Sequence, residues 1–231
     1  DVDGDGIADM AVGAPQEAAG SGGGPVVREG AVFLFLGGDL EATEPYRLLD
    51  NPTGQRDANF GLAVAGGDVD GDGIADVIVG APQQRSGADA DAVVGEGTVF
   101  VYLGSRAGPQ RRPDVTVDNP ADQLFGFFGQ ALGRPADVNG DGFLDLVVGA
   151  PSQESGEGDD RATSEGTVFI LFGGASGPRS DGGADGEIDN PTDQARGFFG
   201  SGLAVRVEDA REDSTMWASR GPARDLEEGR A

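Results

Sequence analysis

The sequence predicts an all-β fold, a partial β-propeller of about three four-stranded antiparallel blades. Three observations predict it: internal repetition, strand-sized apolar segments, and 42 Gly with 13 Pro, which favour turns over long helices. The repeat interval is 67 residues from Asp1 to Asp68 and 69 residues from there to Asp137. This period suits a four-stranded blade with long loops. The alternatives to a propeller are a β-solenoid and a string of independent modules. The period is longer than one coil of a β-solenoid, which disfavours that fold.

The same landmarks recur in the same order in each repeat. An acidic loop runs into Gly-Ala-Pro, and a Glu-Gly segment rich in Val and Phe follows, then Asp-Asn-Pro and finally Phe-Gly. These landmarks divide the chain into a propeller fragment at 1–205 and a divergent tail at 206–231, which we expect to be disordered. The fragment contains repeats at about 1–59, 60–127 and 128–198 and a partial repeat at 199–205.

Four strands are expected in each complete repeat, because β-branched or aromatic runs are bounded there by Gly, Pro and Asp. No segment shows a sustained helical period. The first repeat lacks the segment for its first strand, and a lone first strand is expected from Phe199. Phe60, Phe128 and Phe199 are expected to pack between blades as core. In the second repeat the strands are expected at about residues 62–65, 77–80, 98–103 and 115–117.

The composition is strongly acidic and excludes several kinds of chemistry. The 16 basic residues, all of them Arg, face 41 acidic residues, and the net charge is −25. Such a surface repels nucleic acid and attracts cations, so no nucleic-acid partner is expected. Lys, His and Cys are absent, which excludes a Ser-His-Asp triad, Schiff-base chemistry and a thiolate nucleophile. No apolar run is long enough to span a bilayer, so no membrane insertion is expected.

The acidic loops are predicted to bind Ca²⁺ at three sites. Oxygen-bearing side chains stand at loop positions 1, 3, 5 and 9, and Gly stands at positions 4 and 6, where it permits a tight turn. Ca²⁺ takes six to eight oxygen ligands, and position 7 is expected to add its backbone carbonyl. The predicted ligands are Asp1, Asp3, Asp5, Ile7 and Asp9 in the first loop, Asp68, Asp70, Asp72, Ile74 and Asp76 in the second, and Asp137, Asn139, Asp141, Phe143 and Asp145 in the third.

The alternative for these loops is an Asp-Gly hairpin turn that binds no metal. Such a turn needs one Asp-Gly, whereas three copies here keep an oxygen at each of four positions. Mg²⁺ is the second choice of ion, because it prefers octahedral sites that retain water. Asn139 replaces a carboxylate, so the third site is expected to bind more weakly. Whether the first site is complete is left open, because Asp1 begins the sequence.

Together, the acidic loop, Gly-Ala-Pro and Phe-Gly resemble the FG-GAP repeat family, known from the N-terminal β-propeller of integrin α subunits. Similar repeats occur in glycosylphosphatidylinositol-specific phospholipase D and in secreted bacterial proteins. The resemblance covers residues 1 to about 205, and it implies Ca²⁺ in the acidic loops on one face and ligand-binding loops on the opposite face. Family propellers usually close with about seven blades. Further blades from a longer parent chain, or self-assembly, are therefore expected.

These observations predict a non-enzymatic, calcium-stabilised module of the adhesion type, which binds a protein or glycan ligand. An extracellular or cell-surface location is expected, because cytosolic calcium is too low to fill sites of about 10⁻⁴–10⁻³ M affinity. The alternative is a noncatalytic propeller attached to a secreted hydrolase such as a phospholipase. The variable stretches at 16–28, 83–95 and 152–164 are either ligand-binding loops or solvated spacers.

Overall fold

The computed structural model describes residues 1–18, 29–38, 44–85, 95–154, 164–181, 183–192 and 195–204. These residues form eleven strands in three sheets, and every strand pair is antiparallel. Nothing in the described part of the chain forms a helix of the length and apolarity that a bilayer crossing needs. The predicted disordered tail at 206–231 and most of each variable stretch lie outside the described residues.

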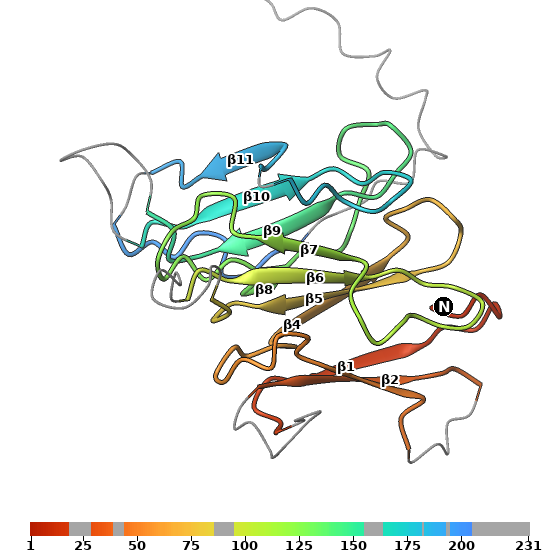
Figure 1. The fold of residues 1–231 in the computed structure, drawn as a ribbon. Helices are drawn as coiled ribbons and strands as arrows, with labels where there is room; N and C mark the ends of the chain where they lie inside the picture. Colours follow the sequence, from red (N-terminus) through yellow and green to blue (C-terminus); the bar gives the residue numbers. More distant parts are fainter. Residues whose placement is uncertain are drawn as a thin grey trace, which may run out of the picture.

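The sheets follow one another along the chain and lie one above the other, with the first sheet at the bottom of Figure 1. The first sheet has three strands, as expected for a repeat that lacks its first strand, and the other two have four. The first contains β1 (Met10–Ala14), β2 (Ala31–Phe35) and β3 (Arg47–Asp50). The second contains β4 (Ala63–Gly67), β5 (Asp76–Ala81), β6 (Thr98–Tyr102) and β7 (Val115–Asp118). The third contains β8 (Ala131–Leu132), β9 (Leu146–Ala150), β10 (Thr167–Leu171) and β11 (Gly186–Asp189).

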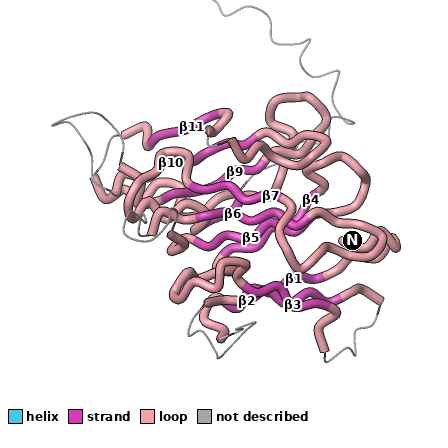
Figure 2. Tube along the Cα trace, in the orientation of Figure 1, coloured by secondary structure: helices cyan, strands magenta, loops and turns pink. Residues whose placement is uncertain are grey.

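The prediction of an all-β fold with four-stranded units is confirmed, and the strands of the second repeat begin and end within two residues of the predicted bounds. Long loops connect the strands at both ends of the stack (Figure 2). The lone first strand expected from Phe199 is not assigned at residues 195–204, which form turns and irregular backbone. Residues 205–231 lie outside the described part of the chain.

Two apolar cores fill the spaces between neighbouring sheets. Phe60 belongs to the core between the first and second sheets, where its ring centroid lies 5.7 Å from that of Phe100. Phe128 belongs to the core between the second and third sheets, 5.6 Å from Phe169. Both side chains are fully buried, which confirms that they pack between blades. Phe199 is half-buried.

A close main-chain contact joins each sheet to the next. The Gly of Gly-Ala-Pro lies against the carbonyl oxygen of the Gly of the following Phe-Gly, so closely that a Cβ atom on Gly80 would stand 2.0 Å from the oxygen of Gly129. The same approach occurs at Gly13 and at Gly149. Because real Cβ atoms never come this near to another heavy atom, only glycine fits at this position. The repeated Gly-Ala-Pro and Phe-Gly motifs are thus the two halves of one joint.

Buried amides reinforce the same joint. The Nδ2 atom of Asn51, after β3, donates to Oε1 of Gln84, after β5, at 3.0 Å. Asn119 donates in the same way to Gln153 at 3.0 Å, across the next junction. All four side chains are buried. Since a buried polar group is costly unless it is paired, each pair ties the last strand of one sheet to the second strand of the next.

Candidate metal sites

The three acidic loops come together at one end of the sheets. They precede β1, β5 and β9 and lie on the right-hand side of Figure 1, where the N-terminus is marked. Consecutive loops are in contact, because the side chain of Ile74 covers Gly4 of the preceding loop and the ring of Phe143 covers Gly71. The residues at position 7 therefore connect neighbouring loops through their side chains. From the sequence we expected only a backbone role for these residues.

The second loop is organised by its own carboxylates. Asp68 accepts hydrogen bonds from the N–H groups of Gly71 and Asp72 through Oδ1 and from that of Gly73 through Oδ2. Asp70 accepts from the N–H of Asp72 at 3.1 Å, and Asp72 accepts from that of Ile74 at 2.8 Å. These bonds fold residues 68–74 into a tight turn that directs several carboxylates toward its centre. The first and third loops repeat the pattern through Asp1 and Asp137.

Asp76, at position 9, is the buried member of the second loop. Its Oδ2 accepts from the N–H of Val69 at 2.7 Å and its Oδ1 from the N–H of Gly104 at 2.8 Å. Only 1% of this residue is exposed, and burial raises its pKa to about 6. Burial removes the water that would solvate the negative charge of Asp76. A cation bound beside this carboxylate would compensate for the lost solvation.

The same two-sided anchoring recurs at position 9 of the other loops. Asp9 accepts from the N–H of Gly37, and Asp145 accepts from that of Gly173. These glycines follow the third strand of each repeat, and a Cβ atom on any of them would stand 2.4 Å from a loop carbonyl oxygen. The role of these glycines was not predicted from the sequence. The signal was present, since Gly follows this strand in each repeat, at 37, 104 and 173.

The structure brings three of the predicted carboxylates together in each of the first two loops. One oxygen from each of Asp68, Asp70 and Asp76 lies within 4.8 Å of the others, and Asp1, Asp3 and Asp9 form the equivalent group. Burial and the neighbouring Asp72 and Asp68 charges raise the pKa of Asp70, although its bond from the Asp72 N–H opposes the shift. Crowded carboxylates with raised pKa values are what a divalent cation would relieve.

Other predicted ligands lie outside these groups of three. Asp5 and Asp72 are not members, and each turns Oδ1 back to the loop backbone. Among the described residues the third loop forms no such group, because Asn139 takes the place of a carboxylate. The Nδ2 atom of Asn139 donates to Oδ2 of Asp141 at 2.9 Å.

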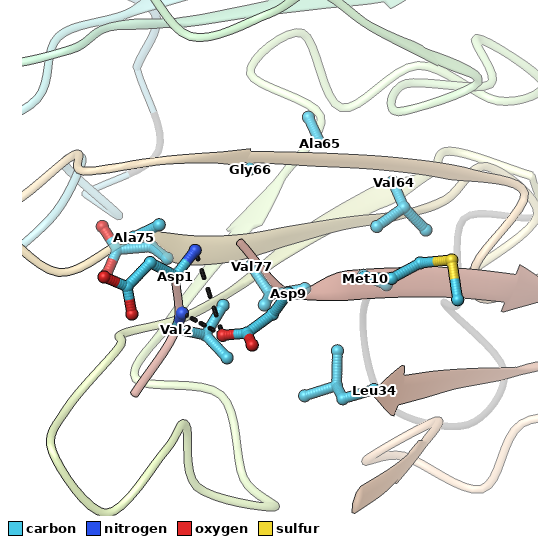
Figure 3. A pocket seen from close by; sticks show the side chains of 12 residues that line it. Asp1, Val2, Asp9, Met10, Leu34, Val64, Ala65, Gly66, Ala75 and Val77 are labelled. Carbon is cyan, nitrogen blue, oxygen red and sulfur yellow. Dashed lines mark hydrogen bonds and ion pairs between the residues drawn. The ribbon is translucent and has the colours of Figure 1, made fainter. Parts of the chain in front are cut away.

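The first loop is more open than the second. Asp9 borders a cavity of about 310 Å³ between the first two sheets, together with Leu34 and Val64 (Figure 3). Its Oδ2 accepts from the N–H of Val2 at 2.6 Å and lies 3.9 Å from the amino group of Asp1. The side chain of Asp9 is 4% exposed, so its carboxylate is buried like that of Asp76. The residues just before it are more exposed than their counterparts in the second loop, because β4 covers one edge of β5, whereas β1 has β2 on one edge and no described strand on the other.

Comparison with known proteins agrees with this architecture. The FG-GAP repeat model matches residues 60–102 and 128–171, and the FG-GAP-like repeat model matches residues 1–79. Integrin alpha-PS3 of Drosophila melanogaster is 36% identical over 160 residues, 67% of this chain and 13% of that protein. Integrin alpha-5 of Xenopus laevis is 32% identical over 154 residues, 65% of this chain and 14% of that protein. Integrin alpha-7 of Homo sapiens is 34% identical over 158 residues, 65% of this chain and 11% of that protein.

The chain spans less than a sixth of the length of these relatives. The matched residues contain the three acidic loops, two complete joints of Gly-Ala-Pro with Phe-Gly and most of the strands. The chain therefore belongs to the FG-GAP repeat family, and its three antiparallel sheets are blades of a β-propeller.

Proposed function

We propose that this chain is a calcium-binding propeller module of the integrin alpha type, which acts outside the cell or at its surface and binds a protein or glycan ligand without catalysis. The observation that carries the proposal is the group formed by Asp68, Asp70 and the buried Asp76. Hard oxygen atoms on a tightly turned loop are the ligands that Ca²⁺ prefers. The equivalent group in the first loop supports the same role.

The proposed ligands are the residues at positions 1, 3, 5, 7 and 9 of each loop. In the second loop, Asp76 fixes the cation relative to the start of β5, while Asp68 and Asp70 close the turn around it. Asp72 would contribute its free oxygen and Ile74 its backbone carbonyl. Because Asn139 removes one negative charge from the third loop, we propose that this site binds more weakly than the second. Ca²⁺ in these loops would hold adjacent blades in register, since the loops touch one another.

The proposed location and partners follow from the chemistry of the site and from the relatives. Extracellular calcium is high enough to fill sites of about 10⁻⁴–10⁻³ M affinity, and several relatives are named as integrin alpha chains. We propose that the loops on the face opposite the acidic loops bind the ligand. Blades that complete a ring would come from a longer parent chain or from another copy.

Thermal unfolding in Ca²⁺, in Mg²⁺ and in a chelator tests the metal proposal. A cation at about 100 times its Kd stabilises the folded state by about 2.7 kcal/mol per site, which corresponds to a rise of roughly 5–10 °C for a chain of this size. We expect this rise with Ca²⁺ and a much smaller one with Mg²⁺. The measurement is far-UV circular dichroism, which follows the loss of secondary structure.

An isosteric variant supplies the control. Asp68→Asn with Asp70→Asn is expected to remove most of the calcium-dependent rise that belongs to the second site. Asp122→Asn changes an exposed aspartate outside the loops, and Asn tolerates its positive φ of 47°. It should leave the rise intact. Coinciding curves in Ca²⁺ and chelator for the unmodified chain would contradict the proposal and leave the loops as turns.

A further inference from the structure

A small groove lies at the end of the second sheet opposite the acidic loops. It has a volume of about 210 Å³ and is lined by described residues of three connections, those from β3 to β4, from β5 to β6 and from β7 to β8. Two arginines, Arg56 and Arg85, line one part of it, and two aromatic residues, Phe125 and Phe127, line another. The groove is smaller than the roughly 300–1,000 Å³ of sites for drug-sized molecules, so it suits a short segment of a larger ligand.

The two arginines are brought together by one glutamine. The side chain of Gln55 accepts a hydrogen bond from the N–H of Arg85 at 2.9 Å and donates to the carbonyl oxygen of Gln83 at 3.1 Å. Arg56 is the next residue after Gln55. The backbones of both arginines are thus fixed at one place, although the residues lie on different loops. Both side chains are exposed.

The aromatic residues form an equally well-defined second part of the groove. The rings of Phe125 and Phe127 meet edge to face with centroids 6.3 Å apart. Both rings lie over Gly95, where a Cβ atom would be 3.1 Å from each of them. The N–H of Phe127 donates to the carbonyl oxygen of Gly95 at 3.1 Å. Phe125 is 54% exposed, so its ring offers apolar surface to a ligand in the groove.

The backbone of this aromatic part is strained. Phe125 and Phe127 have φ values of 59° and 56°, in a region that bulky residues rarely adopt. At the equivalent positions of the preceding repeat, Asp57 and Asn59 have φ values of 57° and 55°, and these residue types tolerate the conformation better. The fold therefore accepts a less costly residue here. Arg196 and Phe198 of the following repeat share the conformation, with φ values of 60° and 48°, so the positive φ belongs to the repeat, and the pair of Phe side chains is what distinguishes this groove.

The next junction shows that the arginines are not needed for folding. There Gln123 accepts from the N–H of Glu154 at 3.0 Å, as Gln55 does from Arg85. Leu124 takes the place of Arg56 and Glu154 that of Arg85. The same scaffold thus carries Leu and Glu at one junction and two arginines at the other, so the arginine pair is free to serve a ligand.

We propose that this groove binds a peptide segment of a protein ligand in which one carboxylate side chain stands next to an apolar side chain. The proposal rests on the proposed binding function and names the chemistry of its ligand. A guanidinium group binds a carboxylate through two parallel hydrogen bonds, and the Phe pair offers apolar surface for the neighbouring side chain. A peptide fits better than an acidic glycan, because the aromatic part calls for an apolar partner.

The charges around the groove limit the ligand to few carboxylates. Asp57 also lines the groove, so two positive charges face one negative charge there. The chain as a whole carries −25 and repels a polyacidic ligand at distances within the Debye length of about 8 Å at physiological ionic strength. A ligand with a single carboxylate can form an ion pair with the arginines, and the long-range repulsion from the rest of the chain stays small.

The proposal is tested with a capped pentapeptide, acetyl-Gly-Phe-Asp-Leu-Gly-amide, added to the full calcium-loaded chain. Binding is followed by NMR through the backbone amides of Gly95 and Phe127. We expect saturable shifts at millimolar peptide, and at least about tenfold weaker binding of the matched peptide with Asn in place of Asp, since hydrogen bonds to charged groups contribute about 1.5–3 kcal/mol. The methyl glycoside of N-acetylneuraminic acid is the carbohydrate probe.

Two variants test whether the peptide binds at the groove. Arg56→Leu with Arg85→Glu copies the residues of the next junction, so the fold is kept, and it should weaken binding of the Asp peptide by at least about tenfold. Phe127→Asn copies Asn59 and should weaken both peptides by a similar factor, which preserves the preference for Asp. Equal affinity for the two peptides, no shifts at millimolar peptide, unchanged binding by the double arginine variant, or binding of the carbohydrate probe in place of the peptide would overturn the proposal.

The calcium response separates this proposal from the function on which it rests. If calcium raises the midpoint of thermal unfolding while the peptide fails to bind, the groove proposal is wrong and the metal proposal stands. If the peptide binds with the expected preference while calcium has no effect, the metal proposal is wrong and the groove proposal stands.

Discussion

Gly80→Ala is expected to destabilise the protein by about 3 kcal/mol or more. The new Cβ atom would lie 2.0 Å from the carbonyl oxygen of Gly129 and 3.0 Å from its carbon. Both are main-chain atoms at the joint between the second and third sheets, so no flexible side chain can move aside. The φ angle of Gly80 is not positive, and the cost is therefore steric. Urea unfolding followed by circular dichroism measures the loss.

Gly66→Ala is the matched control, because it makes the same change in the same sheet. A Cβ atom at Gly66 would meet only the carbonyl oxygen of Asp76, at an ordinary distance of 3.5 Å. Its effect should stay within about 1 kcal/mol, since Ala also restricts the unfolded chain. Similar losses for the two variants would show that the joint between sheets is looser than the structure describes.

Asp76→Ala is expected to lower stability in two separable parts. In a chelator the loss should be about 1–3 kcal/mol, because the buried N–H groups of Val69 and Gly104 lose their acceptors. Removing a desolvated negative charge offsets some of this cost. In calcium at about 100 times its Kd the loss should grow by about 2.7 kcal/mol, as the second site no longer binds. Urea unfolding under both conditions measures each part.

Asp72→Ala separates the proposed metal-ligand role from the anchoring role of Asp76. Asp72 is exposed and accepts one bond from the N–H of Ile74, so its loss in chelator should stay within about 1 kcal/mol. Its loss in calcium should be clearly larger. An Asp76 variant that behaves like the Asp72 variant in chelator would contradict the anchoring role, and equal losses in chelator and calcium for both variants would contradict metal binding.

The strands and their order could be predicted from the sequence because each repeat restates the same local pattern. β5 and β6 are runs of buried, mostly β-branched or aromatic residues between Gly, Asp and Pro, and this pattern specifies a strand without knowledge of its neighbours. The segment after Phe199 begins with the same Phe-Gly motif as the earlier repeats, but it is not assigned as a strand within the described residues. A strand needs a partner edge as well as a suitable sequence.

The grouping of the acidic-loop carboxylates could be predicted from the sequence, whereas the residues that support them could not. Regular spacing identifies Asp68, Asp70 and Asp76 because a loop of nine residues can bring its own side chains together. Gly104 lies 28 residues after Asp76 and reaches it only through the pairing of β5 with β6. The groove at Arg56 and Arg85 depends on contacts across different repeats, and no local pattern marks it.

The joint between sheets has a consequence for how such chains grow. Its central contact consists of glycine and main-chain oxygen, so it does not distinguish one neighbouring blade from another. As far as this contact is concerned, a blade that begins with Phe-Gly can therefore follow any blade that carries Gly-Ala-Pro, and the side chains around the contact decide how well the two sheets fit. Gene duplication can thus reuse one main-chain contact for each added blade, and only the side chains that pack between the sheets need to be adjusted to the new neighbour.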